Sequence, residues 1–132
     1  MRFPDRTTPV GQLINSYLQS ADTENPLDDR AVHLLFSANR WEASHKLVND
    51  LANGNTVICD RYAYSGVAFS SAKTKEDRST TSSNISGSIG GECSHDEDLT
   101  IDWCKAPDVG LPAPDAVIFL DLSQEEATKR GG

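Results

Sequence analysis

Apolar residues near the start of the chain recur with the spacing of one helical face. They are Val10, Leu13, Ile14, Tyr17 and Leu18. This i, i+3, i+4, i+7, i+8 pattern is typical of an amphipathic helix. Thr8 can cap such a helix, and Pro9 suits its first position, where the missing N–H is harmless. We therefore expect a helix that begins at Pro9.

A longer helical pattern follows. We expect this second helix to begin near Asn25-Pro26 and to run to about Ala52, because Gly54 follows as a stop signal. Asp28 and Asp29 then fall in its first turn, where the helix dipole favours acidic side chains. The pattern is long enough to present two distinct faces.

One face of this second helix is mostly apolar and is expected to face the core. Its members are Ala31, Leu34, Ala38, Trp41, His45, Val48 and Ala52. Asp29, His33, Phe36 and Arg40 lie on roughly the opposite side, where Phe36 and Arg40 are adjacent because they are four residues apart. Two interpretations of this pair stay open. Phe36 is either an aromatic side chain covered by another element, or a ring that stacks on a flat ligand whose edge Arg40 binds.

Two short apolar runs, residues 56–59 and 116–120, are rich in β-branched residues and do not alternate with polar ones. Each predicts a strand buried on both faces, as in a parallel sheet. Ser123 and Glu126 form the capping pattern that opens another helix after the second run. Helices that alternate with buried strands indicate an α/β layered fold.

The first apolar run ends in Asp60-Arg61. A carboxylate at the carboxyl end of a strand lies where open α/β sheets bind ligands. There it can help to hold Mg²⁺, and the neighbouring arginine can meet phosphate oxygens. The alternative is a solvated strand end with no chemical role.

Residues 75–98 differ from the rest of the chain. Most positions between Ser79 and Gly91 are Ser, Thr, Gly or Asn, and an acidic cluster follows. Such a segment buries too little apolar surface to offset the entropy lost on ordering. We expect a mobile insertion within a single domain.

Composition and charge exclude several classes of protein. The 132 residues carry 12 basic and 20 acidic side chains, a formal net charge of −8, so a nucleic-acid partner is not expected. No run is long and apolar enough to span a membrane, and the N-terminus does not resemble a targeting peptide. Three cysteines at irregular spacing indicate reduced thiols rather than a disulfide or zinc framework.

The phosphate-binding motif G-x-x-x-x-G-K-[ST] does not occur in these 132 residues. The glycines at 87, 90 and 91 do not replace it, because they lack the lysine. His33, His45 and His95 are scattered, and none is assigned to catalysis.

Several longer segments resemble thymidylate kinase, the nucleoside monophosphate kinase that makes dTDP from dTMP, in its eukaryotic form. They are Arg2-Phe3-Pro4-Asp5-Arg6, residues 33–42, Asp60-Arg61-Tyr62, residues 65–69, Asp102-Trp103-Cys104-Lys105, residues 107–112, Pro114-Asp115 and residues 129–132. The resemblance covers about residues 1–76 and 102–132. It implies a three-layer P-loop nucleoside monophosphate kinase fold with a parallel sheet, incomplete at both ends.

The resemblance also implies roles for individual residues. Phe36 would stack on thymine, Arg40 would bond the edge of the base, and Arg6 and Arg61 would hold the dTMP phosphate. Phe3 and Pro4 would lie at the sugar, and Ser65 and Gly66 would lie at the start of a helix beside the ligand. Asp60 would contact Mg²⁺ through water, and Asp60 and Arg61 would be the catalytic residues. Arg130 would belong to the lid, which begins at residue 129. ATP would be the co-substrate, the protein would be a homodimer, and it would reside in the cytosol or nucleus.

The chain also departs from the family pattern. In the family, a strand, the phosphate loop and a helix precede the Arg-Phe-Pro segment, and further elements follow the start of the lid. The chain is therefore expected to carry the dTMP half of the site without the ATP half. The alternatives are a catalytically inactive remnant, which binds dTMP or pairs with a full-length subunit, and a kinase of another deoxynucleotide.

Overall fold

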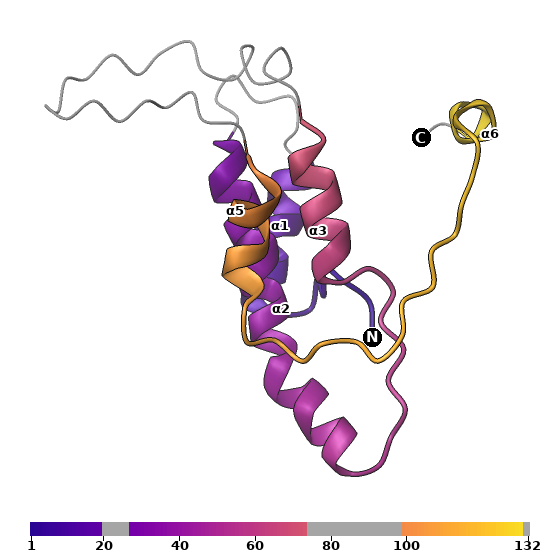
Figure 1. Cartoon of the computed structure of the whole chain (residues 1–132). Coiled ribbons are helices and arrows are strands. Elements are labelled where there is room, and N and C mark those ends of the chain that lie inside the picture. The colour runs from indigo at the N-terminus through magenta and orange to yellow at the C-terminus, as the bar shows by residue number, and fades with distance from the viewer. Residues whose placement is uncertain (20–26, 74–98, 131–132) are drawn as a thin grey trace, which may run out of the picture.

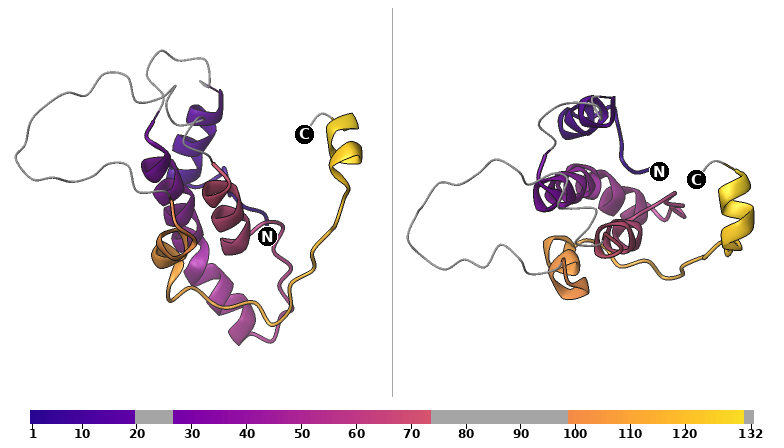
Figure 2. Two further views of the ribbon diagram at one scale, coloured as in Figure 1. Left: turned by 45° about the horizontal axis from the view of Figure 1, so that its top comes forward. Right: turned by 90° about the horizontal axis from the view of Figure 1, so that it is seen from above.

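The structure is a computed structural model that describes residues 1–19, 27–73 and 99–130. The helices are α1 (Pro9–Gln19), α2 (Asp29–Ala52), α3 (Ala63–Ser71), α5 (Ile101–Lys105) and α6 (Gln124–Lys129), with a 3₁₀ turn, η1 (Ala106–Asp108). α2 lies at the centre, with α1 packed on one side and α3 and α5 on the other (Figures 1 and 2). α6 stands apart at the end of an extended segment (Figure 1). The insertion expected at residues 75–98 lies outside the described residues.

The helix ends follow local capping chemistry. The Thr8 hydroxyl accepts a hydrogen bond from the Gly11 N–H at 3.0 Å, which confirms the expected start of α1. The Asp28 carboxylate accepts bonds from two N–H groups of the first turn of α2. At the other end, Gly54 has φ +78°, and its N–H bonds the Leu51 carbonyl at 2.9 Å. The predicted stop of α2 is therefore confirmed, and Asp28 caps the helix rather than lying within it.

The two predicted strands are absent from the described residues, so the structure does not confirm the parallel sheet. Ile58 in the first run is 80% exposed, and Ile118 and Phe119 in the second are 87% and 84% exposed. An apolar run is buried as a strand only when neighbouring strands pair with its edges and helices cover its faces. Within the described residues, run 116–120 has no strand beside it, and run 56–59 has only residues 1–3.

Residues 1–3 do form the beginning of a parallel pair with the end of the first run. Arg2 and Asp60 make an isolated parallel bridge. The Asp60 N–H donates to the Met1 carbonyl at 2.9 Å, and the Phe3 N–H donates to the Asp60 carbonyl at 3.0 Å. The Phe3–Pro4 peptide bond is cis. This short pairing places the start of the chain beside Asp60.

The prediction of which α2 face is buried is wrong. Leu34, Trp41, His45 and Val48, expected in the core, are exposed, whereas the following α2 residues are buried: Val32, His33, Ser37, Asn39, Arg40, Ala43 and Leu47. Hydrophobic periodicity counts apolar side chains alone, but α1, α3, α5 and η1 pack on a face whose buried polar side chains each have at least one hydrogen-bond partner. Burial of such groups is tolerated because their partners replace water.

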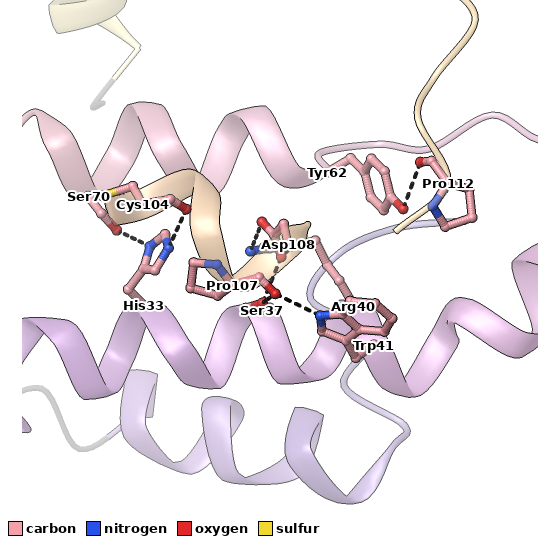
Figure 3. A network of polar contacts seen from close by, with 10 residues as sticks. All are labelled: His33, Ser37, Arg40, Trp41, Tyr62, Ser70, Cys104, Pro107, Asp108 and Pro112. Atoms are coloured by element: carbon pink, nitrogen blue, oxygen red, sulfur yellow. Dashed lines mark hydrogen bonds and ion pairs between the residues drawn. The ribbon is translucent and has the colours of Figure 1, made fainter. Parts of the chain in front are cut away.

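His33 joins three helices within this polar interior. Its Nδ1 lies 2.8 Å from the Ser70 hydroxyl of α3, and its Nε2 lies 2.9 Å from the Cys104 carbonyl of α5 (Figure 3). A carbonyl only accepts hydrogen bonds, so Nε2 carries the proton and, in the neutral ring, Nδ1 accepts from Ser70. His33 is therefore a structural link between α2, α3 and α5.

Replacing His33 with alanine is expected to lower the free energy of unfolding by about 2–4 kcal/mol, because two hydrogen bonds and a buried ring are lost together. Urea unfolding followed by circular dichroism measures the change. His45→Ala is the matched control on the exposed side of the same helix and is expected to change stability by less than about 0.5 kcal/mol. Equal effects of the two variants would contradict the role of His33.

No helix in residues 1–19, 27–73 or 99–130 is long and apolar enough to cross a membrane.

Candidate functional site

Arg40 and Asp108 form a buried ion pair between α2 and η1. Their side chains are 3% and 6% exposed. Arg40 Nε lies 3.0 Å from Asp108 Oδ1, and Nη2 lies 2.7 Å from Oδ2, which is a two-bond, fork-like arrangement (Figure 3). The Ser37 hydroxyl donates to the same carboxylate at 2.7 Å. The orientation of the guanidinium group is therefore fixed on one edge.

Gly66 of α3 covers the other part of this guanidinium. A Cβ atom built on Gly66 would lie 3.1 Å from Arg40 Nη1. In the described part of the chain, Nη1 has no hydrogen-bond partner. The glycine lets α3 approach Arg40 closely and leaves the Nη1 donors uncommitted.

A methyl group at Gly66 is expected to lower stability by about 1–3 kcal/mol, because Asp108 prevents the Arg40 group from moving aside. Thermal unfolding of Gly66→Ala measures the loss. In an Arg40→Ala background the same substitution meets no guanidinium, and the better helix propensity of alanine should make it neutral or slightly stabilising. An equal loss in both backgrounds would show that the contact with Arg40 is not the cause.

Two aromatic rings lie beside this pair. The centroids of the Phe3 and Tyr62 rings are 5.5 Å apart, and the Tyr62 hydroxyl donates to the Pro112 carbonyl at 3.2 Å. The pKa of Tyr62 is raised, chiefly by burial and then by its electrostatic interactions with Cys59 and Asp108, while Arg40 opposes the rise. Tyr62 is thus neutral at physiological pH and close to the ion pair.

A hollow of about 270 Å³ opens next to this cluster, between α3 and residues 109–114. Tyr62, Val67 and Asp108 are among the residues that line it, and its walls are mostly apolar. Phe3, Phe36, Arg40 and Gly66 are not among the lining residues, so the hollow lies beside the Arg40–Asp108 pair rather than around the Arg40 guanidinium.

The basic residues predicted to hold phosphate lie on the surface. Arg61 is exposed and has φ +60°, a left-handed backbone conformation that is unfavourable for a side chain other than glycine. Arg6 is also exposed, and its Nη1 lies 3.1 Å from the Asn15 side-chain oxygen. Asp60 forms an exposed ion pair with Arg2 at 3.3 Å. Strained residues concentrate at functional sites, so Arg61 stands out.

α3 begins two residues after Arg61, with Tyr62 as its cap residue. The cap residue of this nine-residue helix makes no side-chain hydrogen bond to it. The first N–H groups of a helix without such a cap are available to an anion. The exposed Ser65 lies in this first turn.

The structure brings some predicted site residues together and leaves others apart. Phe3, Arg40 and Gly66 meet around Tyr62 and Asp108, two residues of the family motifs that were not among the predicted site residues. Pro4 follows Phe3, and Phe36 is half-buried one turn before Arg40 on α2. Arg130 ends α6, which stands apart from the other helices (Figure 1). Within the described residues no group of three or more His, Cys, Asp or Glu side chains forms a metal site.

Comparison with known proteins decides the family. The sequence profile described as thymidylate kinase matches residues 1–90. The chain belongs to the thymidylate kinase family. The cluster of Phe3, Arg40, Tyr62, Gly66 and Asp108 lies in a thymidylate kinase chain, and four of these five residues fall within the matched residues.

Individual relatives agree with this assignment. The thymidylate kinase of Dictyostelium discoideum is 47% identical over 131 residues, which are 99% of this chain and 47% of the relative. The human enzyme is 44% identical over 99% of this chain and 50% of its own length. The solved thymidylate kinase of Candida albicans superposes with a TM-score of 0.80 at 43% identity, over 99% of this chain and 54% of that one. The chain spans about half the length of these relatives.

Proposed function

We propose that this chain provides the dTMP-binding half of a thymidylate kinase, which transfers the γ-phosphate of ATP to dTMP and forms dTDP. The observation that carries the proposal is the buried Arg40 guanidinium, fixed on one edge by Asp108 and left with uncommitted Nη1 donors. A fixed donor beside aromatic rings and a hollow is suited to reading the edge of a base.

The chemistry of the donors favours thymine over cytosine. Thymine carries a carbonyl oxygen, an acceptor, where cytosine carries an amino group, a donor. The Nη1 donors of Arg40 would bond the first and oppose the second. Phe36 would stack on the ring, and stacking is tolerant of base identity. Base selection would therefore rest on Arg40, with Phe3 and Pro4 at the sugar.

The phosphate of dTMP would lie at the start of α3. Arg61, strained and exposed, lies two residues before the first residue of this helix, which has no side-chain cap, and Ser65 and Gly66 fall within its first turn and a half. Arg6 would add a second cation. A guanidinium fork and helix N–H groups both suit a phosphate dianion.

The transfer step would need little acid–base chemistry from the protein. The accepting phosphate oxygen of dTMP is already anionic, so alignment and neutralisation of charge dominate catalysis. Mg²⁺, held mainly by nucleotide oxygens and water, would neutralise phosphate charge when bound. The single exposed carboxylate of Asp60 fits a contact through water but not an independent metal site. Arg130 would belong to a lid.

Three further expectations belong to the same proposal. Residues 56–59 and 116–120 would become strands of a parallel sheet, and their exposed apolar side chains support this. The exposed apolar stripe of α2, with Leu34, Trp41 and Val48, would pair with a second subunit. The thiol of Cys59 is free, which suits a reducing cytosolic or nuclear location.

A second candidate function is a non-catalytic chain that binds dTMP or pairs with a full-length subunit. It is favoured by one observation, the lack of G-x-x-x-x-G-K-[ST] in these 132 residues. This motif supplies the backbone and lysine that hold ATP phosphates.

Phosphate transfer and intact mass separate the two candidates. The native product is purified, its mass is measured, and dTDP formation from ATP and dTMP is assayed. A product longer than 132 residues that makes dTDP supports the kinase, and we expect the 132-residue chain alone to make none. A native product of 132 residues without turnover supports the second candidate.

A further inference from the structure

Asn39 is fully buried, yet its side chain is saturated with hydrogen bonds. Its Oδ1 accepts from the Asp5 N–H at 2.7 Å, and its Nδ2 donates to the Asp5 carbonyl at 3.0 Å. Nδ2 also donates to the Thr8 hydroxyl at 2.8 Å. The amide thus pairs with the backbone of one residue much as a neighbouring peptide unit would, and fixes the chain direction there.

The loop of residues 5–8 is held at its other end by Glu42. Its Oε2 accepts from the Thr8 hydroxyl at 2.6 Å, and its Oε1 lies 3.2 Å from the Val10 N–H. The bond from Thr8 lowers the pKa of Glu42, so this carboxyl is ionised at neutral pH. Asn39 and Glu42 are one turn apart on α2, and together they hold both ends of the loop.

The opposite side of the loop lies against α1 with no spare room. A Cβ atom built on Gly11 would lie 1.8 Å from the Asp5 carbonyl oxygen. Within the loop, the Asp5 carboxylate accepts from the N–H and the hydroxyl of Thr7, at 3.0 Å and 2.6 Å. The loop is therefore clamped between α1 and α2 and braced internally.

Arg6 is the residue that this clamp presents. Its neighbours on either side are bonded, while its own side chain is exposed. Asn39 directly precedes Arg40, whose guanidinium is fixed by Asp108. Asn39, which anchors the Arg6 loop, is therefore joined by a single peptide bond to Arg40, the residue proposed to read the base.

We propose that Asn39 is a positioning residue that sets Arg6 at a fixed distance from Arg40, so that one nucleotide reaches both. This inference rests on the proposed function, because it concerns the phosphate of the same ligand. Loss of Asn39 would leave base binding intact and weaken only the contribution of the phosphate. Thymidine, which lacks the phosphate, separates the two contributions.

The test compares binding of dTMP and thymidine to the 132-residue chain, by calorimetry, for wild type and Asn39→Ala. The affinity for dTMP is expected to fall about tenfold, the value of one charged hydrogen-bonded contact, while that for thymidine is unchanged. In an Arg6→Ala background, Asn39→Ala should cause no further loss of dTMP affinity. Asn49→Ala, the same change at an exposed position of α2, is the matched control and should change neither affinity.

A second variant guards against misfolding of Asn39→Ala. Thr8→Val removes the hydroxyl at the far end of the clamp, together with its cap on α1, and should cause a smaller loss in the same direction. Equal losses of dTMP and thymidine affinity in both variants, or no loss in either, would overturn the role of Asn39 and leave the proposed function standing. A wild-type chain that binds neither ligand would overturn the proposed function and this inference together.

Discussion

Replacing Asp108 with alanine is expected to lower the free energy of unfolding by about 3–5 kcal/mol, because it leaves the charge of Arg40 buried without a partner. Arg40 is 3% exposed, so its guanidinium has almost no contact with solvent where it lies. A small domain has about 5–15 kcal/mol of stability in all, so the variant should be barely folded at room temperature. Urea unfolding measures the change.

Two controls identify the cause. The double variant Arg40→Met with Asp108→Leu removes both charges, and we expect it to recover most of the lost stability. Asp50→Ala breaks the exposed pair with Lys46 and should cost less than about 1 kcal/mol. A loss of that small size for Asp108→Ala would contradict the buried pair as an organising feature.

Replacing Arg61 with glycine is expected to stabilise the chain and weaken dTMP binding at the same time. Glycine adopts φ near +60° at little cost, so stability should rise by about 1 kcal/mol. Loss of the guanidinium should weaken dTMP binding about 10- to 100-fold, equivalent to about 1.4–2.8 kcal/mol. Thermal unfolding and calorimetric titration measure the two effects.

Opposite changes in stability and affinity are the signature of a residue strained for function. Arg61→Lys keeps a positive charge but loses the fork, and should bind dTMP with intermediate affinity. Lys46→Ala, a change on the exposed surface of α2, should leave affinity unchanged. Equal binding of dTMP to wild type and Arg61→Gly would remove Arg61 from the proposed phosphate site.

Local chemistry explains which structural predictions succeeded. The start of α1, the stop of α2 and the cap of α6 each depend on residues a few positions apart: Thr8 with Gly11, Gly54 with Leu51, and Ser123 with Glu126. Such contacts form whatever the rest of the chain does. The strands were not confirmed because a strand depends on neighbours that are remote in sequence.

The same difference between local and remote contacts explains which parts of the candidate site could be predicted from the sequence. The spacing of Phe36 and Arg40 predicted that they are adjacent, because both lie on one helix. The partner that fixes Arg40, Asp108, lies 68 residues away, and no periodic pattern connects the two. A useful signal was available, since an arginine on a packed helix face needs a carboxylate. Hydrophobic periodicity counts apolar side chains alone, and it therefore predicted the opposite face of α2 as the buried one.

We propose above that this chain binds dTMP through Arg40, a fixed arginine that reads the base. Calorimetric titration of the 132-residue chain with dTMP and with dCMP tests it most directly. We predict one dTMP bound per chain, with dCMP at least about tenfold weaker, because its amino group opposes the donors of Arg40. No binding of dTMP, or equal binding of dTMP and dCMP, would contradict the account.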